Sequence, residues 1–186
     1  GDLNRVLAGI EAAKRVGLTP VKLNVVALGG FNDDEFADFI ELTRKEPYVV
    51  RFIELMPIGQ GKEKHTLKEA EVKHILSETY GTIRPCEEKL GSGPAHYRKI
   101  DGFEGKIGFI SAISHKFCSG CNRVRMTADG FLKPCLQYET GMDLRTLLRD
   151  GVSDAELKVQ IETIITQKPK CHHFGEINEP ERTEHR

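Results

Sequence analysis

Three closely spaced cysteines constrain this chain more than any other feature of its sequence. Cys118, Cys121 and Cys135 form the pattern C-x2-C-x13-C. Two thiolates separated by two residues can bind one metal centre, because the turn between them aims both sulfurs the same way. The stretch before the third cysteine reads as a hairpin, with runs at 123–127 and 131–133 around an Asp-Gly turn. Folding of this hairpin would bring Cys135 near Cys121.

Three thiolates without an obvious fourth ligand leave several kinds of site open. A structural zinc site has four closed ligands, so zinc would need His115, His172 or His173 as the fourth. A [4Fe-4S] cluster held by three cysteines keeps one iron open to a non-protein ligand, and unliganded thiols are the third possibility. We interpret His115 as a loop residue, Cys86 as a plain thiol, and residues 171–173 as an incidental group in a polar, mobile tail.

Two arginines follow the second cysteine directly. On a strand, Arg123 and Arg125 would share one face while Val124 takes the other. Two guanidinium groups beside a metal centre would form a seat for phosphates. The alternative is a solvated strand edge with ordinary surface arginines.

Composition bounds the class of protein. The chain has 186 residues, a net charge of −1, 39% hydrophobic and 30% charged residues, which is typical of one large or two small soluble domains. No apolar run approaches the roughly 18 residues of a membrane span, and no signal peptide opens the sequence. An odd number of cysteines, five, fits a reducing interior, so we expect a cytoplasmic protein. The near-neutral charge argues against nucleic acid as a partner.

The first part of the chain alternates helices and strands, which is typical of an α/β fold. A helix capped by Asp2 and ended by Gly17 precedes a strand at 21–27. Lys22 and Asn24 share one face of this strand, which predicts a ligand-lined lumen or, alternatively, a wet edge strand. Arg51 places a second cation in the next strand, at 49–55. Met56 follows at the strand end, where (βα) barrels assemble their chemistry, although a single methionine is more often a core residue.

The remaining elements read as a second region that begins after a Gly-rich link at 59–61. Four patterns mark it: a helix capped by Thr66 and Glu69, a strand pair around an Asp-Gly turn, the cysteine hairpin, and two final helices. The predicted ranges are a helix to about residue 80, strands at 96–100 and 106–111, a helix at 144–148, and a helix capped by Ser153 and Glu156 with Leu157, Ile161, Ile164 and Ile165 as its buried stripe.

The cysteine stretch also resembles a known family. The run FCSGCNRVRMTADGFLKPCL is similar to the C-terminal motif of the GTP 3',8-cyclases, radical-SAM enzymes that open molybdenum cofactor biosynthesis. Upstream, VKLNVV and VRFIELMPIG are similar to the same family in the expected order. The resemblance implies the C-terminal part of a partial (βα)6 radical-SAM barrel at residues 1–59, followed by an α+β auxiliary iron–sulfur cluster region at 60–186. It favours a [4Fe-4S] cluster over zinc.

The resemblance also implies roles for individual residues. The cluster ligands would be Cys118, Cys121 and Cys135, with the open iron meeting the guanine of GTP. Further GTP contacts would come from Arg123, Val124, Arg125 and Lys22, with Arg51 joining the phosphate contacts, and Met56 would touch S-adenosylmethionine. In the whole enzyme, a 5'-deoxyadenosyl radical would abstract the ribose 3' hydrogen of GTP, and the carbon radical would attack C8 of guanine. The product would pass to cyclic pyranopterin monophosphate synthase.

Two departures from the family stand out. The five cysteines contain no C-x3-C-x2-C motif for the cluster that binds S-adenosylmethionine. We therefore expect an N-terminal part of the barrel as the missing partner, and an inactive chain without it. Family members commonly end in Gly-Gly, whereas this sequence ends at 183–186 with Thr-Glu-His-Arg. The alternatives are another radical-SAM enzyme with an auxiliary cluster, such as a peptide-modifying maturase, or a non-enzymatic Cys3His zinc module.

Overall fold

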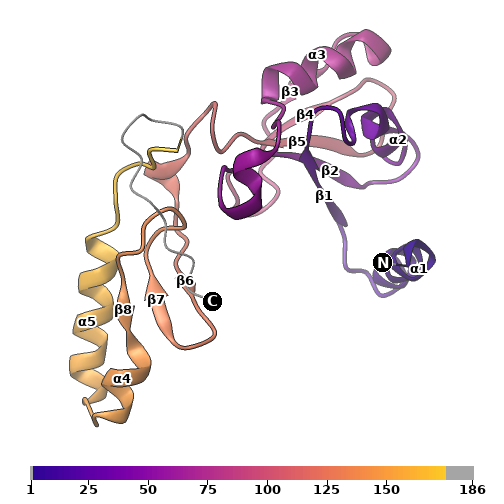
Figure 1. The fold of residues 1–186 in the computed structure, drawn as a ribbon. Coiled ribbons are helices and arrows are strands. Elements are labelled where there is room, and N and C mark those ends of the chain that lie inside the picture. Colours follow the sequence, from indigo (N-terminus) through magenta and orange to yellow (C-terminus); the bar gives the residue numbers. More distant parts are fainter. Residues whose placement is uncertain (1, 175–186) are drawn as a thin grey trace. The chain divides into compact units, whose positions relative to one another are not determined.

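A computed structural model describes residues 2–174 of the chain, so the C-terminal 183–186 stretch lies outside the described residues. The structure has a mixed α/β fold, as the sequence predicts, and its helices and strands form two compact units (Figure 1). Within the described residues, the first unit comprises 2–56 and 63–115, and the second comprises 57–62 and 116–174. None of the helices within residues 2–174 combines the length and the apolar character that crossing a membrane requires.

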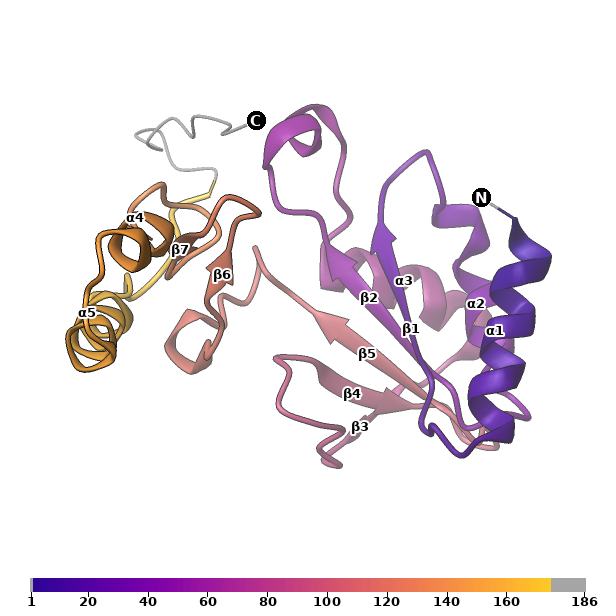
Figure 2. The same cartoon turned by 90° about the horizontal axis from the view of Figure 1, so that it is seen from below.

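A five-stranded mixed sheet organises the first unit (Figures 1 and 2). Its order is β1 (Lys22–Ala27), β2 (Val49–Glu54), β5 (Lys106–Ile110), β4 (His96–Lys99) and β3 (Arg84–Cys86). Strands β1, β2 and β5 run parallel, and β4 is antiparallel to both of its neighbours. The predicted strands at 21–27, 49–55, 96–100 and 106–111 are confirmed, whereas β3 lacks a prediction.

The hydrophobic core of the first unit lies between this sheet and two helices, α2 (Phe36–Glu41) and α3 (Glu69–Tyr80) (Figure 2). Every second side chain of the strands points into it, because successive side chains alternate between the two faces. Phe52 packs edge-on against Phe36 and stacks on Phe109, with ring centroids 4.9 and 6.1 Å apart. The opposite face of β1 and β2 carries Lys22 and Arg51.

Strand β5 pairs with β2, so the structural units divide the chain differently from the expected boundary at residue 59. The alternation of Ile107 and Phe109 supplies two buried side chains to the core beside Phe52. Gly108 lies between them on the polar face. A Cβ at this glycine would come within 2.9 Å of Cγ of Arg51 and 3.1 Å of the Tyr97 ring, so the close crossing of these side chains requires glycine.

Three helix starts differ in part from the sequence expectations. Asp2 caps α1 (Leu3–Arg15) as predicted, but no residue of α1 is buried, and Leu3, Val6 and Leu7 are exposed. Asn32 followed by Glu35 also predicts a helix cap, but the side chain of Asn32 makes no cap hydrogen bond and instead binds the backbone of residues 26 and 28. Thr66 accepts a hydrogen bond from the backbone N–H of Leu55, and α3 is capped two residues later than predicted, by residues 68 and 71.

The second unit holds a small antiparallel sheet and two helices (Figure 1). Strands β6 (Arg125–Met126), β7 (Phe131–Lys133) and β8 (Met142–Asp143) lie in sequence order, and α4 (Leu144–Arg149) and α5 (Asp154–Thr166) follow. The predicted Asp-Gly hairpin is confirmed, with Gly130 at a φ of 89°. Ser153 and Glu156 form the predicted capping box of α5. The predicted stripe of α5 is not buried: three of its four residues are half-buried and Ile165 is 45% exposed.

Candidate functional site

The thiol segment (residues 117–135) begins with a single 3-10 turn, η3 (Cys118–Gly120). The backbone N–H of Cys121 donates to the carbonyl of Cys118 at 3.1 Å, which closes the loop between the first two cysteines. Cys135 follows two residues after β7, which pairs with β6 just after the second cysteine. All three thiols are free and half-buried. The local structure therefore supplies the turn and the hairpin that the cysteine spacing predicts.

Lys168 contacts the middle of the thiol segment from the end of the described chain. Its Nζ donates to the carbonyl of Cys121 at 2.9 Å, to Sγ of Cys121 at 3.3 Å, and to the carbonyl of Arg123 at 2.6 Å. Burial raises the pKa of the Cys121 thiol, but hydrogen bonds from the backbone N–H of Arg123 and from Lys168 outweigh it and hold this pKa below its ordinary value. The environment favours a thiolate, the form that binds metals.

Histidines lie at different places around these thiols. His172 is buried, and its ring centroid is 4.9 Å from that of Phe174. His173 Nε2 lies 3.8 Å from Sγ of Cys171. His115 belongs to the first unit, where Nδ1 contacts the hydroxyl of Ser114 at 3.0 Å. Within residues 2–174, no three Cys, His, Asp or Glu side chains are grouped so that they could hold a single metal ion.

The C-terminal segment (residues 168–174) packs on the thiol-bearing part of its unit, and the prediction of a mobile tail is wrong for these residues. Three hydrogen bonds hold its backbone: Tyr138 Oη donates to the carbonyl of Cys171 at 3.2 Å, Lys116 Nζ to that of His172 at 3.1 Å, and the backbone N–H of His173 to Oε1 of Gln137 at 2.6 Å. Polar composition hid this segment from sequence reasoning, because its contacts are made by the backbone and by single side chains.

The arginines after the second cysteine are exposed, as is Val124. Only Arg125 lies on strand β6, opposite Lys133 of β7. Arg123 lies outside the strand, which differs from the expectation that Arg123 and Arg125 share a strand face. The carbonyl of Arg123 binds Lys168 rather than a neighbouring strand, and this contact explains why the ladder begins later.

Polar side chains line the outer face of β1 and β2 in the first unit. The Nζ of Lys22 donates to the carbonyl of Leu90 at 2.6 Å, and Nε of Arg51 donates to Oδ1 of Asn24 at 2.8 Å. Both cations are half-buried. Strand β1 is the edge of the sheet within the described residues, which agrees with the edge-strand interpretation, and the ligand-lined lumen stays a prediction.

A buried carboxylate fixes the end of strand β2, two residues before the half-buried Met56. Glu54 is 3% exposed and accepts hydrogen bonds from the backbone N–H groups of Glu69, Ile113 and Ser114 at 2.7–2.9 Å and from the Ser114 hydroxyl. Burial raises the pKa of Glu54, but these donors outweigh it and hold the pKa below its ordinary value. Sequence reasoning missed Glu54, although a carboxylate in an apolar strand is a signal of such a role.

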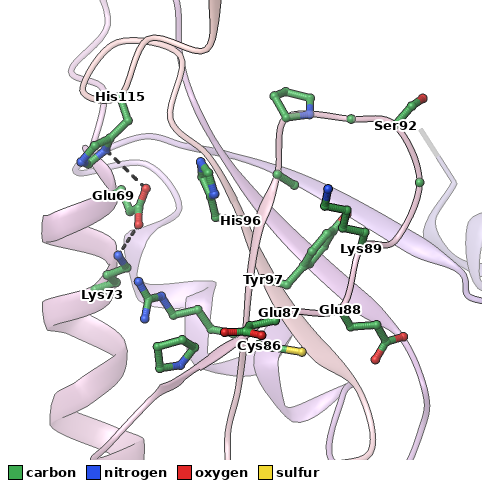
Figure 3. Close-up of a pocket in the computed structure, with 16 residues that line it drawn as sticks. Glu69, Lys73, Cys86, Glu87, Glu88, Lys89, Ser92, His96, Tyr97 and His115 are labelled. Carbon is green, nitrogen blue, oxygen red and sulfur yellow. Dashed lines mark ion pairs between the residues drawn. The ribbon is translucent and has the colours of Figure 1, made fainter. Parts of the chain in front are cut away.

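Glu69 extends this network to the wall of a cleft of about 730 Å³ (Figure 3). Its carboxylate pairs with Lys73, accepts from the Ser111 hydroxyl, and lies 3.6 Å from Nδ1 of His115. Figure 3 shows His115 and Lys73 on opposite sides of this carboxylate. The thiol of Cys86, on β3, also lines the cleft. The structure thus places Cys86 and His115 in the first unit, and the three clustered cysteines in the second.

Comparison with known proteins gives a consistent match. The family model described as Molybdenum Cofactor Synthesis C matches residues 48–174. Among curated proteins, the chain is 43% identical over 178 residues to a GTP 3',8-cyclase of Syntrophomonas wolfei. It is 47% identical over 177 residues to one of Desulforamulus reducens and 44% identical over 176 residues to one of Moorella thermoacetica. Each alignment covers 94% of this chain and 54% of the relative, so the chain spans about half the length of the curated relatives it matches.

Proposed function

This chain belongs to the Molybdenum Cofactor Synthesis C family, and on that premise we propose that it is the C-terminal part of a GTP 3',8-cyclase. In this role it binds GTP, which the whole enzyme converts to (8S)-3',8-cyclo-7,8-dihydroguanosine 5'-triphosphate for molybdenum cofactor biosynthesis. The observation that carries the proposal is the thiol segment. Its three free cysteines flank the two exposed arginines in one hairpin of the second unit.

The three thiols fit an auxiliary [4Fe-4S] cluster by their chemistry. Cys118, Cys121 and Cys135 are free and half-buried, and an ammonium group at Cys121 offsets the charge of a thiolate. When bound, the cluster would supply one iron without a protein thiolate, which is an open position for the guanine of GTP. The protein's own share is to hold three thiolates and to keep the hairpin in place.

The exposed arginines of the second unit suit binding of a triphosphate. Arg123 and Arg125 are exposed, and no carboxylate within residues 2–174 forms an ion pair with either. Their forked guanidinium groups suit bidentate contacts with phosphate oxygens, with Val124 between them as a further contact. Lys22 and Arg51 would provide additional cationic contacts from the polar face of β1 and β2.

The first unit would be part of a radical-SAM barrel. Its parallel strands β1, β2 and β5 fit that architecture, and β1 is an edge to which further strands could pair. Met56, just after β2, would contact S-adenosylmethionine. This sequence contains no C-x3-C-x2-C motif, so the second cluster, which generates the radical, belongs to the N-terminal part of the barrel, the partner without which this chain is inactive.

The same proposal implies a cellular compartment and a next enzyme for the reaction. Five free cysteines and an iron–sulfur site suit a reducing cytoplasm. The cyclised nucleotide would be handed to cyclic pyranopterin monophosphate synthase. The cofactors carry the difficult radical chemistry, and the protein contributes binding, orientation and electrostatics.

Anaerobic reconstitution with iron and sulfide tests this proposal. The chain should take up about four irons and four sulfides, as expected for one [4Fe-4S] cluster. Replacement of Cys118, Cys121 or Cys135 by serine should abolish this uptake, whereas Cys86→Ser in the first unit should not. Zinc binding without sulfide would favour the zinc-module alternative, and cluster loss in Cys86→Ser would overturn the ligand assignment.

Nucleotide binding tests the arginines separately. The double variant Arg123→Ala/Arg125→Ala should weaken GTP binding by roughly 10- to 150-fold, because a hydrogen bond to a charged group contributes about 1.5–3 kcal/mol. Iron content should stay unchanged. Arg149→Ala, an exposed arginine at the end of α4, is the matched control. Equal GTP affinity in the double variant and the control would return these arginines to the role of surface charges.

A further inference from the structure

One ammonium group connects the two functional parts of the thiol segment. A lysine ammonium carries three N–H donors and no acceptor. In Lys168, the three acceptors are the carbonyl of Cys121, its Sγ, and the carbonyl of Arg123, at 2.9, 3.3 and 2.6 Å. Every donor of Lys168 therefore has an acceptor within a three-residue stretch, which lies 45 to 47 residues earlier in the chain.

The stretch between the second cysteine and strand β6 has little else to hold it. The side chains of residues 122–125 are exposed, so burial does not fix them. The sheet ladder begins only at Arg125. Lys168 itself is well placed to act as an anchor, because the rest of the C-terminal segment is held by Tyr138, Lys116 and Gln137.

We propose that Lys168 is a positioning residue with two effects: it raises the reduction potential of a cluster bound at Cys121, and it holds the Arg123 backbone in place for phosphate binding. This inference rests on the proposed function, because it takes Cys121 as a ligand and Arg123 as a phosphate contact. The N–H···S hydrogen bond and the nearby positive charge carry the first effect. The hydrogen bond to the Arg123 carbonyl carries the second.

The direction of the first effect follows from charge. Reduction adds one negative charge to an iron–sulfur site, and a nearby cation stabilises the reduced form more than the oxidised form. Hydrogen bonds to the sulfurs are among the factors that set cluster potentials. Removal of the ammonium should therefore lower the potential, while a guanidinium at the same position should preserve much of the charge effect.

The second effect depends on geometry rather than charge. Arginine presents a planar fork of donors, whereas the ammonium directs three protons to three separate acceptors. Lys168→Arg should therefore fail to hold the Cys121 and Arg123 carbonyls as lysine does. The two substitutions separate the effects, since methionine removes both and arginine removes mainly the second.

Three measurements on the full chain test the inference, with Lys170→Met as the matched control. Lys170 lies two residues further along and is exposed. In Lys168→Met, redox titration of the reconstituted protein should show an equilibrium constant for one-electron reduction of the cluster that is tenfold smaller than in the wild type. This change corresponds to a reduction potential lower by about 59 mV. Lys168→Arg should retain most of the potential. GTP affinity should fall about tenfold in both variants, which is comparable to the loss of one hydrogen bond to a charged group.

The third measurement follows the backbone directly. With all four proteins treated with iron and sulfide in the same way, hydrogen exchange at the amides of residues 121–126 should be faster in Lys168→Met and Lys168→Arg than in the wild type and in Lys170→Met. If the wild type binds neither cluster nor GTP, the proposed function fails while the exchange result still decides whether Lys168 orders this stretch. Unchanged exchange in Lys168→Met would overturn the inference, as would an unchanged potential in a variant that retains its cluster.

Discussion

Each of the two units of this molecule is stabilised internally by a different kind of interaction. Within residues 2–174, twelve buried residues form the main hydrophobic core cluster, and all of them belong to the first unit. Among the described residues of the second unit, the buried apolar side chains are Leu132, Pro134 and Phe174, and they share the interior with Lys133, Gln137 and His172. A unit with so little buried apolar surface gains little from the hydrophobic effect. The residues that hold the thiols are linked mainly by hydrogen bonds.

This difference indicates how each unit acquires its order. The first unit can fold on its core, with the polar face of β1 and β2 as a consequence of strand alternation. The second unit needs another source of free energy, and metal binding can supply it, because the free energy of binding a metal at a site absent from the unfolded chain is also free energy of folding.

Iron removal should separate the two units most strongly. When the cluster of the reconstituted chain is removed with a chelator, we expect amides of β7 and α5 to lose their slow hydrogen exchange, while amides of β2 and β5 keep theirs. The reason is the lack of an apolar core around the thiols. Equal loss of protection in both units would show that they form one cooperative whole, and undiminished protection in both would show that the second unit needs no metal.

A substitution in the hydrophobic core should, in contrast to iron removal, destabilise the first unit more than the second. Phe109 is 1% exposed and stacks on Phe52, so Phe109→Ala should lower the free energy of unfolding of the first unit by about 3–5 kcal/mol. Leu157→Ala on α5, where the side chain is half-buried, should cost clearly less. Unfolding in urea, followed by hydrogen exchange at amides of each unit, measures the loss of stability in both variants. A larger effect of Leu157→Ala would reverse the comparison.

The Glu54 network should give the first unit a particular dependence on pH. The pKa of folded Glu54 lies below its ordinary value of 4.5, so its contribution is complete above that value and is lost as the pH falls through the lower folded pKa. Glu54→Gln should lower the free energy of unfolding by about 1–3 kcal/mol at pH 7, because it disrupts buried hydrogen bonds. The variant should also lose less stability than the wild type as the pH falls.

Urea midpoints at pH 7 and pH 4 measure this effect. Glu78→Gln, an exposed carboxylate on α3, is the control and should leave the pH profile unchanged. A Glu54→Gln profile parallel to the wild type would show that other carboxylates produce the acid loss.

The smallest expected effect concerns the cap of α5. Ser153 accepts a hydrogen bond from the N–H of Glu156, and Ser153→Ala should destabilise this helix by about 1 kcal/mol. Because α5 has no buried residue, the change should speed exchange in α5 without altering that of β2. Exchange that changes equally in β2 would mean that the two units unfold together.

Patterns with a local cause were predicted well from the sequence. The Asp-Gly turn, the Ser153–Glu156 capping box and the strands around Lys22 and Arg51 each depend on neighbouring residues. The partner of β5 was not predicted, since alternating Ile107 and Phe109 indicate a strand but not which strand it pairs with. The division of the chain followed from that pairing and differed from expectation accordingly.

The candidate site could be predicted from the sequence only in part, because some of its contacts join residues that are far apart in the chain. Cysteine spacing and the hairpin indicated the thiol segment, because both are local. Lys168 and Glu54 act over long separations, through a backbone carbonyl or N–H groups of distant residues, and such acceptors and donors look alike at every position. The apolar strand around Glu54 marks that carboxylate as unusual, but the sequence pattern does not identify its distant donors, and no pattern marks Lys168. The proposed ligand and GTP-contact roles remain predictions that the experiments above address.

The contact between Lys168 and Cys121 also sets an order in time. Lys168 is synthesised 47 residues after Cys121, and chains grow at about 5–20 residues per second, so the two are separated by roughly 2–9 s of translation. During this interval the cysteine pair exists without the ammonium that later contacts it. A metal delivered to the nascent chain would meet the thiols while the lysine is still absent, whereas one delivered after release would meet a Cys121 thiol that is already hydrogen-bonded. The 47-residue separation of the two residues therefore means that the proposed cluster, if delivered during synthesis, would meet Cys121 before the Lys168 contact can form.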